Sequence, residues 1–428
     1  MRKLWTAFLA LSLASFVSAK NTTLFSSLPA TAGDEPVASA TMDWGSYLTV
    51  SPLELNLEVS SMGTFSAGKM TIQVDGIFYN AHLDHFEEQE QTKSWFGRFG
   101  ASPYLSHFAF VGAAVAGKVW LPDGTSREII SRGGKAFLVE MNDEELAKGL
   151  ANCQMPGYSP LVEANEILGG GVLRNIRRRI LTSGCPKGQI LTWEKLLLYI
   201  YDATTLDWFL GDKDALVAFA QACVDGINAV HTNSLIPQYR VRLVGVEPVN
   251  YTSEGDLVAD AMWMQASGEV ATLRARTGAV EVGLLVGISN SIAGIAWGGI
   301  SDGLYGMRPV SHIVFLGGGI QTAIHEDGHN DGMQHQKEDC SGWTPRPDSF
   351  GWFRDGFGKD VTAVGIGKYC PNACPSFPVV SNPNVRVSRP ELGLTGIPAG
   401  IPDEAENWRM PEMAYQLYGI LPTCQCSE

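Results

Sequence analysis

Three of the chain's eight histidines lie close together in the sequence, at His325, His329 and His335. Because a helix brings residues four positions apart onto one face, His325 and His329 can present their imidazoles in the same direction. Gly332 follows them, and a glycine at the end of a helix can adopt positive φ and turn the chain sharply. Such a turn brings His335 back toward the other two. The spacing therefore predicts a helix that ends in a tight turn and directs three imidazoles at one point.

This arrangement has the chemistry of a catalytic metal site. Three neutral imidazoles bind zinc at about 2.0–2.1 Å and leave one tetrahedral position open for water. Glu326 directly follows His325, so its carboxylate lies beside the ion, where it can take a proton from water. We therefore predict one Zn²⁺ ion held by His325, His329 and His335, with Glu326 as the general base. The alternative is a solvated, histidine-rich helix end, but these five fixed positions rarely coincide by chance.

The charge and the first residues of the chain limit its partners. The chain has 31 Lys and Arg against 45 Asp and Glu, a formal net charge of −14. Because this field repels polyanions, we expect no nucleic-acid partner. Residues 1–19 combine two early basic residues, a short apolar run and a small-residue end, which is typical of a signal peptide. No later stretch is suited to crossing a bilayer, so we expect a secreted, extracellular protein with no membrane partner.

Secretion makes two further predictions about modification. In an oxidising compartment most of the eight cysteines should form disulfides. They are Cys153, Cys185, Cys223, Cys340, Cys370, Cys374, Cys424 and Cys426. Asn21 and Asn250 each begin an Asn-X-Thr acceptor for N-glycosylation in a eukaryotic host.

A glycine tract at residues 169–171, followed by an arginine cluster at 174–179, marks a joint in the chain. A flexible tract that ends in cations is a good substrate for a processing protease, and we predict cleavage near Arg177 or Arg179. The alternative is a solvated basic loop. We accordingly divide the chain into a signal peptide (1–19), a β-rich prodomain with its basic cleavage linker (20–179) and a zinc domain (180–428).

The hydrophobic pattern differs on the two sides of this joint. Upstream, short β-rich runs separated by Gly and Asp turns predict an all-β module, with strands over 69–74, 108–115, 117–120 and 128–130. Downstream, strands and helices alternate, which predicts an α/β layered domain. The expected strands are 191–201, 240–249, 281–288, 293–297 and 312–316, and the expected helices are 212–231, 256–276 and one that begins near residue 320.

The window from His325 to His335 resembles the extended zinc motif of the metzincin peptidases. Gly328 and Asn330 make it similar to the reprolysin branch, in particular the secreted peptidyl-Asp metalloendopeptidase-like proteins. Further segments resemble that group's first long helix and second strand (231–249), its β-rich prodomain (69–138) and a stretch near its C-terminus (381–385). The resemblance implies a metzincin-like α/β (α+β) zincin domain that hydrolyses protein or peptide substrates. It also implies a zymogen held inactive by its own prodomain.

The chain also departs from that family. Val364 stands where the methionine of the Met-turn is expected, which leaves a smaller apolar floor under the zinc. Asp327 and Asp331 lie on the helix face opposite the histidines, where the family has apolar residues. Buried carboxylates are costly unless they are solvated or paired, so either this face is wetter or the enzyme has degenerated. The second functional hypothesis is therefore a catalytically weak or inactive relative that binds proteins through its old cleft.

Two other motifs point to further chemistry. Cys153, ahead of the predicted cleavage site, is a candidate cysteine switch whose thiolate would fill zinc's fourth position in the precursor. The alternative is a disulfide, for instance with Cys185. Residues 299–303 fit the G-x-S-x-G pattern of a serine hydrolase, but that motif must lead into a helix, and the Gly and Pro in residues 304–309 favour a loop.

Overall fold

The computed structural model describes much of the chain in segments. They are residues 22–27, 47–55, 70–74, 76–89, 91–141, 189–290, 292–297, 310–337, 348–352, 377–389, 394–411, 418 and 423–426. Several predictions fall outside these residues: the signal peptide, Asn21, Cys153, Arg177, Arg179, Val364 and the 299–303 segment. Among the described residues, no helix combines the length and apolar character needed to cross a membrane.

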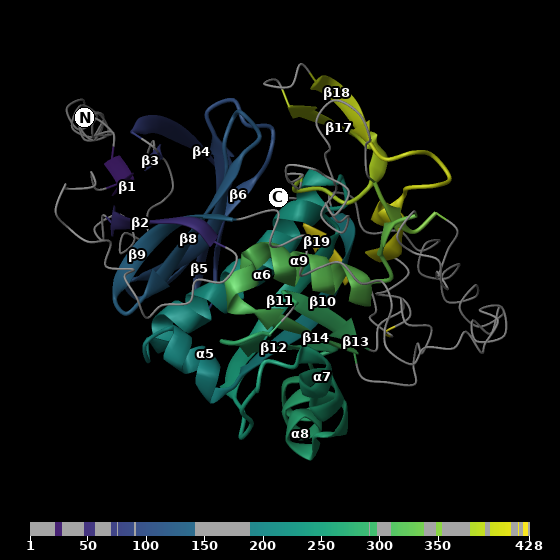
Figure 1. The fold of residues 1–428 in the computed structure, drawn as a ribbon. Coiled ribbons are helices and arrows are strands. Elements are labelled where there is room, and N and C mark those ends of the chain that lie inside the picture. The colour runs from purple at the N-terminus through teal and green to yellow at the C-terminus, as the bar shows by residue number, and fades with distance from the viewer. Residues whose placement is uncertain are drawn as a thin grey trace, which may run out of the picture.

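The N-terminal part is a closed β-barrel, drawn in purple and blue in Figure 1. Its strands are β1 (Thr22–Ser27), β2 (Tyr47–Leu55), β3 (Met70–Val74), β4 (Ile77–Glu88), β5 (Lys93–Phe99), β6 (Ser106–Val111), β7 (Ala114–Trp120), β8 (Ser126–Arg132) and β9 (Lys135–Met141). Neighbouring strands are antiparallel except β1 and β3, whose parallel pairing closes the barrel. Trp95, Phe99 and Phe108 help to fill the interior.

One predicted strand of the barrel is wrong. The segment expected to form a single strand over 108–115 is the end of β6, a turn and the start of β7. Gly112 in that turn has φ of +56°, a left-handed conformation that an extended strand cannot contain.

The C-terminal part is built on a sheet in the order β11-β10-β12-β14-β13. Its strands are β10 (Gln189–Tyr201), β11 (Tyr239–Pro248), β12 (Glu281–Val286), β13 (Gly294–Trp297) and β14 (Val310–Phe315), and β19 (Thr423–Cys426) pairs with the start of β10. Strands β11, β10, β12 and β14 are mutually parallel, whereas the edge strand β13 runs antiparallel to β14. This sheet agrees with the α/β alternation read from the sequence.

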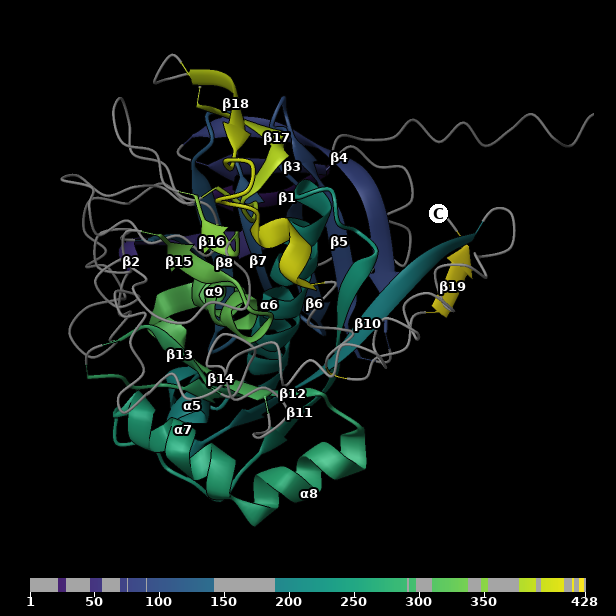
Figure 2. The same ribbon diagram turned by 90° about the vertical axis from the view of Figure 1, so that its right-hand side faces the viewer.

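Helices cover both faces of this sheet, as Figure 2 shows. They are α5 (Ala203–Trp208), α6 (Lys213–Asn233), α7 (Leu257–Ala266), α8 (Gly268–Thr277) and α9 (Gly319–Asn330), with a 3₁₀ turn, η2 (Leu316–Gly318), before α9. Successive residues of β10 serve opposite faces. Leu197 and Tyr199 pack in the core with α6, whereas Leu198 and Ile200 pack in the core with α7 and α8.

The expected single helix over 256–276 is also wrong. The segment forms α7 and α8, which meet at Ser267. Ser267 has an extended backbone, and its hydroxyl accepts a hydrogen bond from the Val270 N–H, so it ends one helix and caps the next.

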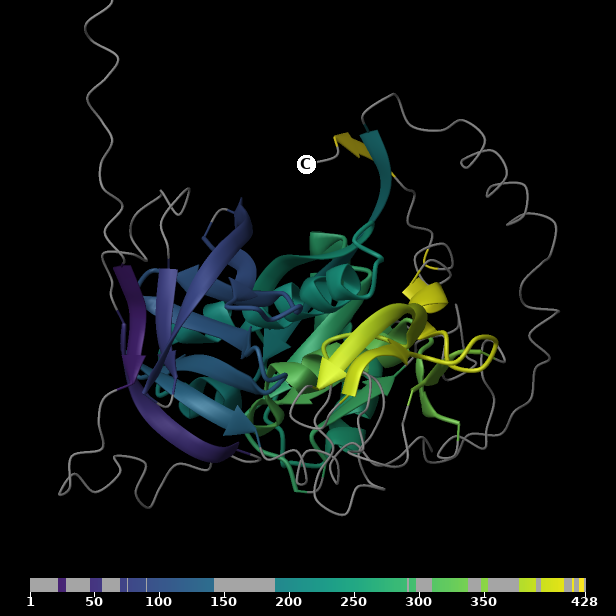
Figure 3. The same ribbon diagram turned by 90° about the horizontal axis from the view of Figure 1, so that it is seen from above.

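The remaining strands form two small ribbons. β15 (Gln334–Gln336) pairs with β16 (Phe350–Gly351), and β17 (Asn382–Arg389) pairs with β18 (Leu394–Ala399). A short 3₁₀ turn, η4 (Asn407–Arg409), follows β18. Seen from above, these ribbons and the α/β layers lie beside the barrel (Figure 3). Cys223 in the middle of α6 is buried and free, so the expectation that the cysteines mostly pair fails at this position, where apolar core surrounds the thiol.

Candidate metal centre

Helix α9 and the turn after it carry the histidine window. The helix follows directly from β14 through η2 and ends at Asn330. Gly332 has φ of +91°, as the sequence predicted. The Gly332 N–H donates to the His329 carbonyl and the Met333 N–H donates to the Gly328 carbonyl, both at 2.9 Å. This is a Schellman motif, and it turns the chain into β15, which carries His335.

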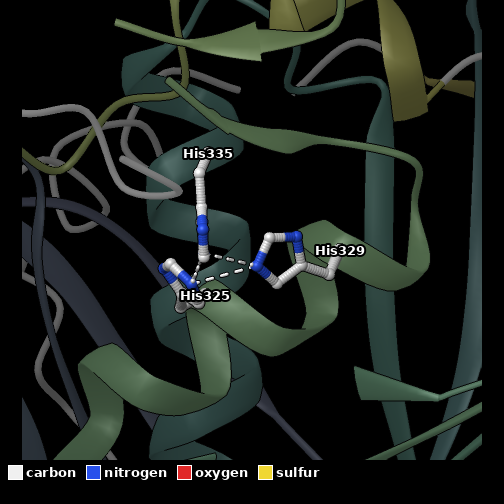
Figure 4. A group of neighbouring side chains, drawn as sticks. All are labelled: His325, His329 and His335. Atoms are coloured by element: carbon white, nitrogen blue, oxygen red, sulfur yellow. Dashed lines mark hydrogen bonds between the residues drawn. The ribbon is translucent and has the colours of Figure 1, made fainter. Parts of the chain in front are cut away.

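The three histidines converge, as Figure 4 shows. The Nε2 atoms of His325 and His335 are 2.9 Å apart, and the Nε2 of His329 lies 3.0 Å from each of them. The Nδ1 of His329 lies 2.8 Å from the Met333 carbonyl. Because that oxygen can only accept, Nδ1 carries the proton, and the Nε2 lone pair is left to face the other two rings.

The residues present fit a zinc ion. Two ligands bound at 2.0–2.1 Å in a tetrahedral arrangement are about 3.3 Å apart, close to the Nε2 separations in this triangle. Burial lowers the pKa of His329 to about 4, although its bond to the Met333 carbonyl opposes the shift. The ring is therefore neutral near pH 7, which is the form that binds metals. Among the described residues, these three histidines are the group whose ligand atoms gather closely enough to hold an ion.

Glu326 follows His325 on α9 and packs against the edge strand β13. Only 3% of the surface of Glu326 is exposed to solvent. Burial raises its pKa to about 8, and a hydrogen bond from the Ala296 backbone partly offsets the shift. Strand β13 comes very close: a Cβ on Gly294 would lie 2.8 Å from Glu326 Cγ and 2.5 Å from Thr322 Cγ2. Glycine at this position lets the strand rest directly on the glutamate.

The direction of the β13 backbone groups follows from one hydrogen bond. The Phe315 N–H donates to the Ala293 carbonyl at 2.9 Å, so Ala293 faces β14. Backbone groups alternate along an antiparallel strand. Gly294 and Ala296 therefore turn theirs away from β14, toward the outer edge above Glu326. This confirms the predicted strand over 293–297 and places it at the edge of the sheet, in contact with helix α9.

The opposite face of α9 holds a buried cluster of charges. Lys195 of β10 is completely buried, and its Nζ lies 2.7 Å from Asp327 Oδ1 and 2.8 Å from Asp331 Oδ1. The same Nζ lies 2.9 Å from Glu281 Oε2 on β12. The two aspartates that depart from the family pattern are thus paired with a lysine. The sequence left two explanations for this face, a wetter surface or a degenerate enzyme. The first is wrong, because the carboxylates are buried and paired inside the protein.

Further polar residues complete this cluster, which we call the Lys195 network (Lys195, Glu281, His312, Asp327, Asn330 and Asp331). Glu281 Oε1 lies 2.6 Å from His312 Nδ1 and 2.6 Å from the Asn330 side-chain nitrogen. Although burial opposes ionisation, Lys195 and His312 hold the pKa of Glu281 below its usual range. Burial raises the pKa of Asp331 well above its usual range against the pull of Lys195.

Sequence reasoning missed the partners of Asp327 and Asp331. Lys195, Glu281 and His312 each lie in or next to an apolar strand, in contexts such as WEKLLLYIY and PVSHIVFLG. Charged side chains are almost never fully buried unless they are paired. A charged residue inside such a strand is therefore a signal that could have suggested an internal partner.

The predicted glycosylation acceptor Asn250 lies exposed just after β11. Its side chain is accessible to a modifying enzyme, and its glycosylation stays a prediction.

Comparison of the chain with models of protein families finds no match, and comparison with curated proteins finds none either. A solved structure described as "Structure of a chaperone-substrate complex" resembles 53% of this chain, with 17% identity and a TM-score of 0.42. The matched region spans only 35% of that structure's chain. A likeness at this level carries no conclusion about fold or function.

Proposed function

We propose that this chain is a secreted zinc metalloendopeptidase of the metzincin type, made as a zymogen. The observation that carries the proposal is the convergence of three Nε2 atoms at 2.9–3.0 Å, with a buried glutamate at the position after His325 on the same helix. Three nitrogen ligands and an adjacent base are the parts that metal-assisted hydrolysis of a peptide bond requires.

Each residue has a distinct task in this reaction. His325, His329 and His335 hold the zinc ion, and when bound the ion supplies Lewis-acid chemistry that makes water more acidic and polarises a carbonyl. In its ionised form, which the charge of a bound zinc ion would favour against the effect of burial, Glu326 accepts a proton from the attacking water and donates it to the departing amine. The Ala296 N–H holds the Glu326 carboxylate in place before substrate arrives.

The edge strand β13 gives the substrate a place to bind. An extended peptide can add to the exposed edge of a sheet through backbone hydrogen bonds. The Gly294 and Ala296 backbone groups face that edge directly above Glu326, so a peptide aligned there passes the catalytic glutamate. Recognition through backbone groups fits an endopeptidase, which must bind chain on both sides of the cleaved bond.

Secretion and zymogen processing rest on the sequence. They are supported by the signal peptide at 1–19, the basic linker with Arg177 and Arg179, and the β-rich module ahead of that linker. Cys153 remains the candidate switch residue, with a disulfide as its alternative. The partners proposed are a protein or peptide substrate, the chain's own prodomain and a processing protease.

The hypothesis of a degenerate protein-binding relative loses one of its supports. It was motivated in part by Asp327 and Asp331, whose carboxylates are costly to bury unless they are solvated or paired, but Lys195 pairs with both. No observation on the described residues favours it over catalysis.

The test is the Glu326→Ala variant, compared with wild type and with Glu254→Ala, a control at an exposed position. We expect the Glu326 variant to keep stoichiometric zinc in metal analysis, because Glu326 is not a ligand. Its hydrolysis of a general protein substrate should fall by about 10²–10⁴-fold, the usual contribution of a general base. Undiminished cleavage by Glu326→Ala would refute the assigned base, and a wild-type protein that binds no zinc would refute the proposal.

A further inference from the structure

The barrel and the zinc domain share hydrophobic cores. One buried cluster joins barrel residues such as Val111, Ile130 and Val139 to Phe219 and Val224 of α6. The α6 residue Ala229 joins Phe96 and Leu105 of the barrel in a smaller cluster, and the barrel's Tyr104 and Trp120 pack with Phe377 and Val385 near the C-terminus. Helix α6 is consequently buried on the barrel side as well as on the sheet side (Figure 1).

Polar contacts fix the barrel to both ends of α6. The Gly134 N–H donates to the side chain of Asp212, the N-cap of α6, at 3.0 Å. At the other end, the Leu105 N–H donates to the Asn233 side chain, also at 3.0 Å. The guanidinium of Arg132 lies 4.5 Å from the centre of the Trp208 ring on α5. These contacts fix where the barrel lies along α6 and how far it lies from that helix.

The barrel also reaches the start of the histidine helix. Glu128 of β8 is fully buried, and its Oε2 accepts the Ile320 N–H at the first turn of α9 at 3.2 Å. Lys118 of β7 lies 3.2 Å from Glu128 Oε1 and 3.4 Å from Gln321 Oε1 on α9. Gly319 has φ of +68°, and a Cβ there would lie 2.5 Å from Glu128 Oε2. A carboxylate at this end of a helix is stabilised by the helix dipole.

We propose that the barrel is a permanent subunit of the mature protein, and that its Glu128 is a positioning residue for α9. This inference rests on the proposed processing in the linker, since it concerns what happens after the cut. The contacts above are made by residues up to 141 and from 203 onward, so cleavage near Arg177 or Arg179 breaks none of them. Departure of the barrel would expose an apolar face of α6 to water. The partner that this surface fits is the barrel cut from the same chain.

The first experiment measures whether the cut halves stay together. A recognition sequence for a specific protease replaces Gly169–Gly171 in the full chain, and Cys153→Ser with Cys185→Ser excludes a disulfide tether. After complete cutting, we expect both fragments to elute from gel filtration together, in equal amounts, at the volume of the uncut protein. Separate elution of the fragments, whether the C-terminal one stays folded or precipitates, overturns the proposal. The readout needs no peptidase activity, so it can fail or succeed independently of the proposed function.

The second experiment tests Glu128 through zinc affinity, measured by competition with a chromogenic chelator. We expect Glu128→Ala to weaken zinc binding about tenfold, as when a group that orients a ligand is lost, and Glu128→Gln, which keeps an oxygen acceptor toward Ile320, to restore most of it. The matched control is Ile129→Ala, which truncates a residue of the barrel interior. It should lower the unfolding temperature and leave zinc affinity unchanged. Equal losses of zinc affinity in Glu128→Ala and Ile129→Ala would overturn the positioning role.

Discussion

The two faces of helix α9 differ in how their polar groups are matched by positive charge. On one face three imidazoles gather with their nitrogens 2.9–3.0 Å apart, an arrangement completed by a cation from outside the chain. On the other face Asp327 and Asp331 meet a cation that the chain supplies itself, the ammonium of Lys195. One face of the helix can therefore bind a metal cation from solution, and the other face already binds the ammonium group of Lys195.

This difference shows why charges on α9 have different meanings. A buried group is costly only when its charge or hydrogen-bonding capacity is unmatched. The Lys195 network matches its own charges across β10, β12 and α9, so it holds the helix to the sheet. The histidine face is left neutral and preorganised, which is what a metal site needs. We expect the two faces to respond to different perturbations.

The largest expected effect is loss of the internal cation. Lys195→Met leaves buried carboxylates without their lysine, and removing one partner of a buried ion pair costs about 3–5 kcal/mol. The free energy of unfolding, measured by chemical denaturation, should fall by this amount. The control Lys213→Met, at an exposed position that opens α6, should change it by less than about 0.5 kcal/mol.

A combined variant guards against simple failure to fold. Lys195→Met with Asp327→Asn and Asp331→Asn removes the unmatched charges along with the lysine. It should recover more than half of the loss, because a neutral replacement of a whole buried ion cluster is well tolerated. A triple variant no more stable than Lys195→Met would show that the charges themselves are not the cause.

Removal of zinc should have the next largest effect on the free energy of unfolding. This effect should depend only on the histidine face of α9. Ligand binding to the native state raises its stability by about 2.7 kcal/mol when free zinc is 100 times the dissociation constant. Unfolding measured with zinc and with a chelator should differ by this amount in wild type and in Asp331→Asn. The difference should vanish in His329→Ala. A zinc-dependent shift that persists in His329→Ala would place the metal elsewhere.

The contact of β13 with Glu326 can be broken by a single methyl group. Gly294→Ala puts a Cβ 2.5 Å from Thr322 Cγ2 and 2.8 Å from Glu326 Cγ, and such overpacking costs about 1–3 kcal/mol. We expect this loss in unfolding measurements and a reduced rate of hydrolysis, with zinc content unchanged. Gly268→Ala is the matched control, since nothing lies within 4 Å of its added Cβ. Full activity in Gly294→Ala would mean that β13 does not position the glutamate.

The sequence predicted the histidine face better than the network because the two depend on different distances along the chain. His325, His329, Gly332 and His335 act through spacings of a helix and one turn, which local rules describe. Lys195 lies 132 residues from Asp327, and only the assembled sheet brings them together. A single sequence does not give the register between β10 and α9, so the pairing could not be predicted.

The fold shows the same division. Strands and helices with clear periodicity, such as β10 and α6, were found within about two residues of their ends. The errors lie where one residue changes the backbone direction: Gly112 divides a strand and Ser267 divides a helix. Closure of the barrel through parallel pairing of β1 with β3, and its shared core with α6, depend on contacts between distant segments.

The smallest expected effect concerns the turn at Gly332, which joins α9 to β15. Gly332 lies close to the histidines in the sequence, and its backbone conformation decides where His335 lies. At φ of +91°, an added Cβ costs roughly 1–2 kcal/mol through left-handed strain. Gly332→Ala should lose about this much stability in the presence of zinc, and its zinc affinity should fall, because relaxing the strain moves His335 away from the other two nitrogens. Gly278→Ala is a matched control: Gly278 also has positive φ, +70°, at the end of α8, so it should lose similar stability with unchanged zinc affinity. If both variants keep full zinc affinity, the turn affects only folding, and β15 alone must hold His335 in place.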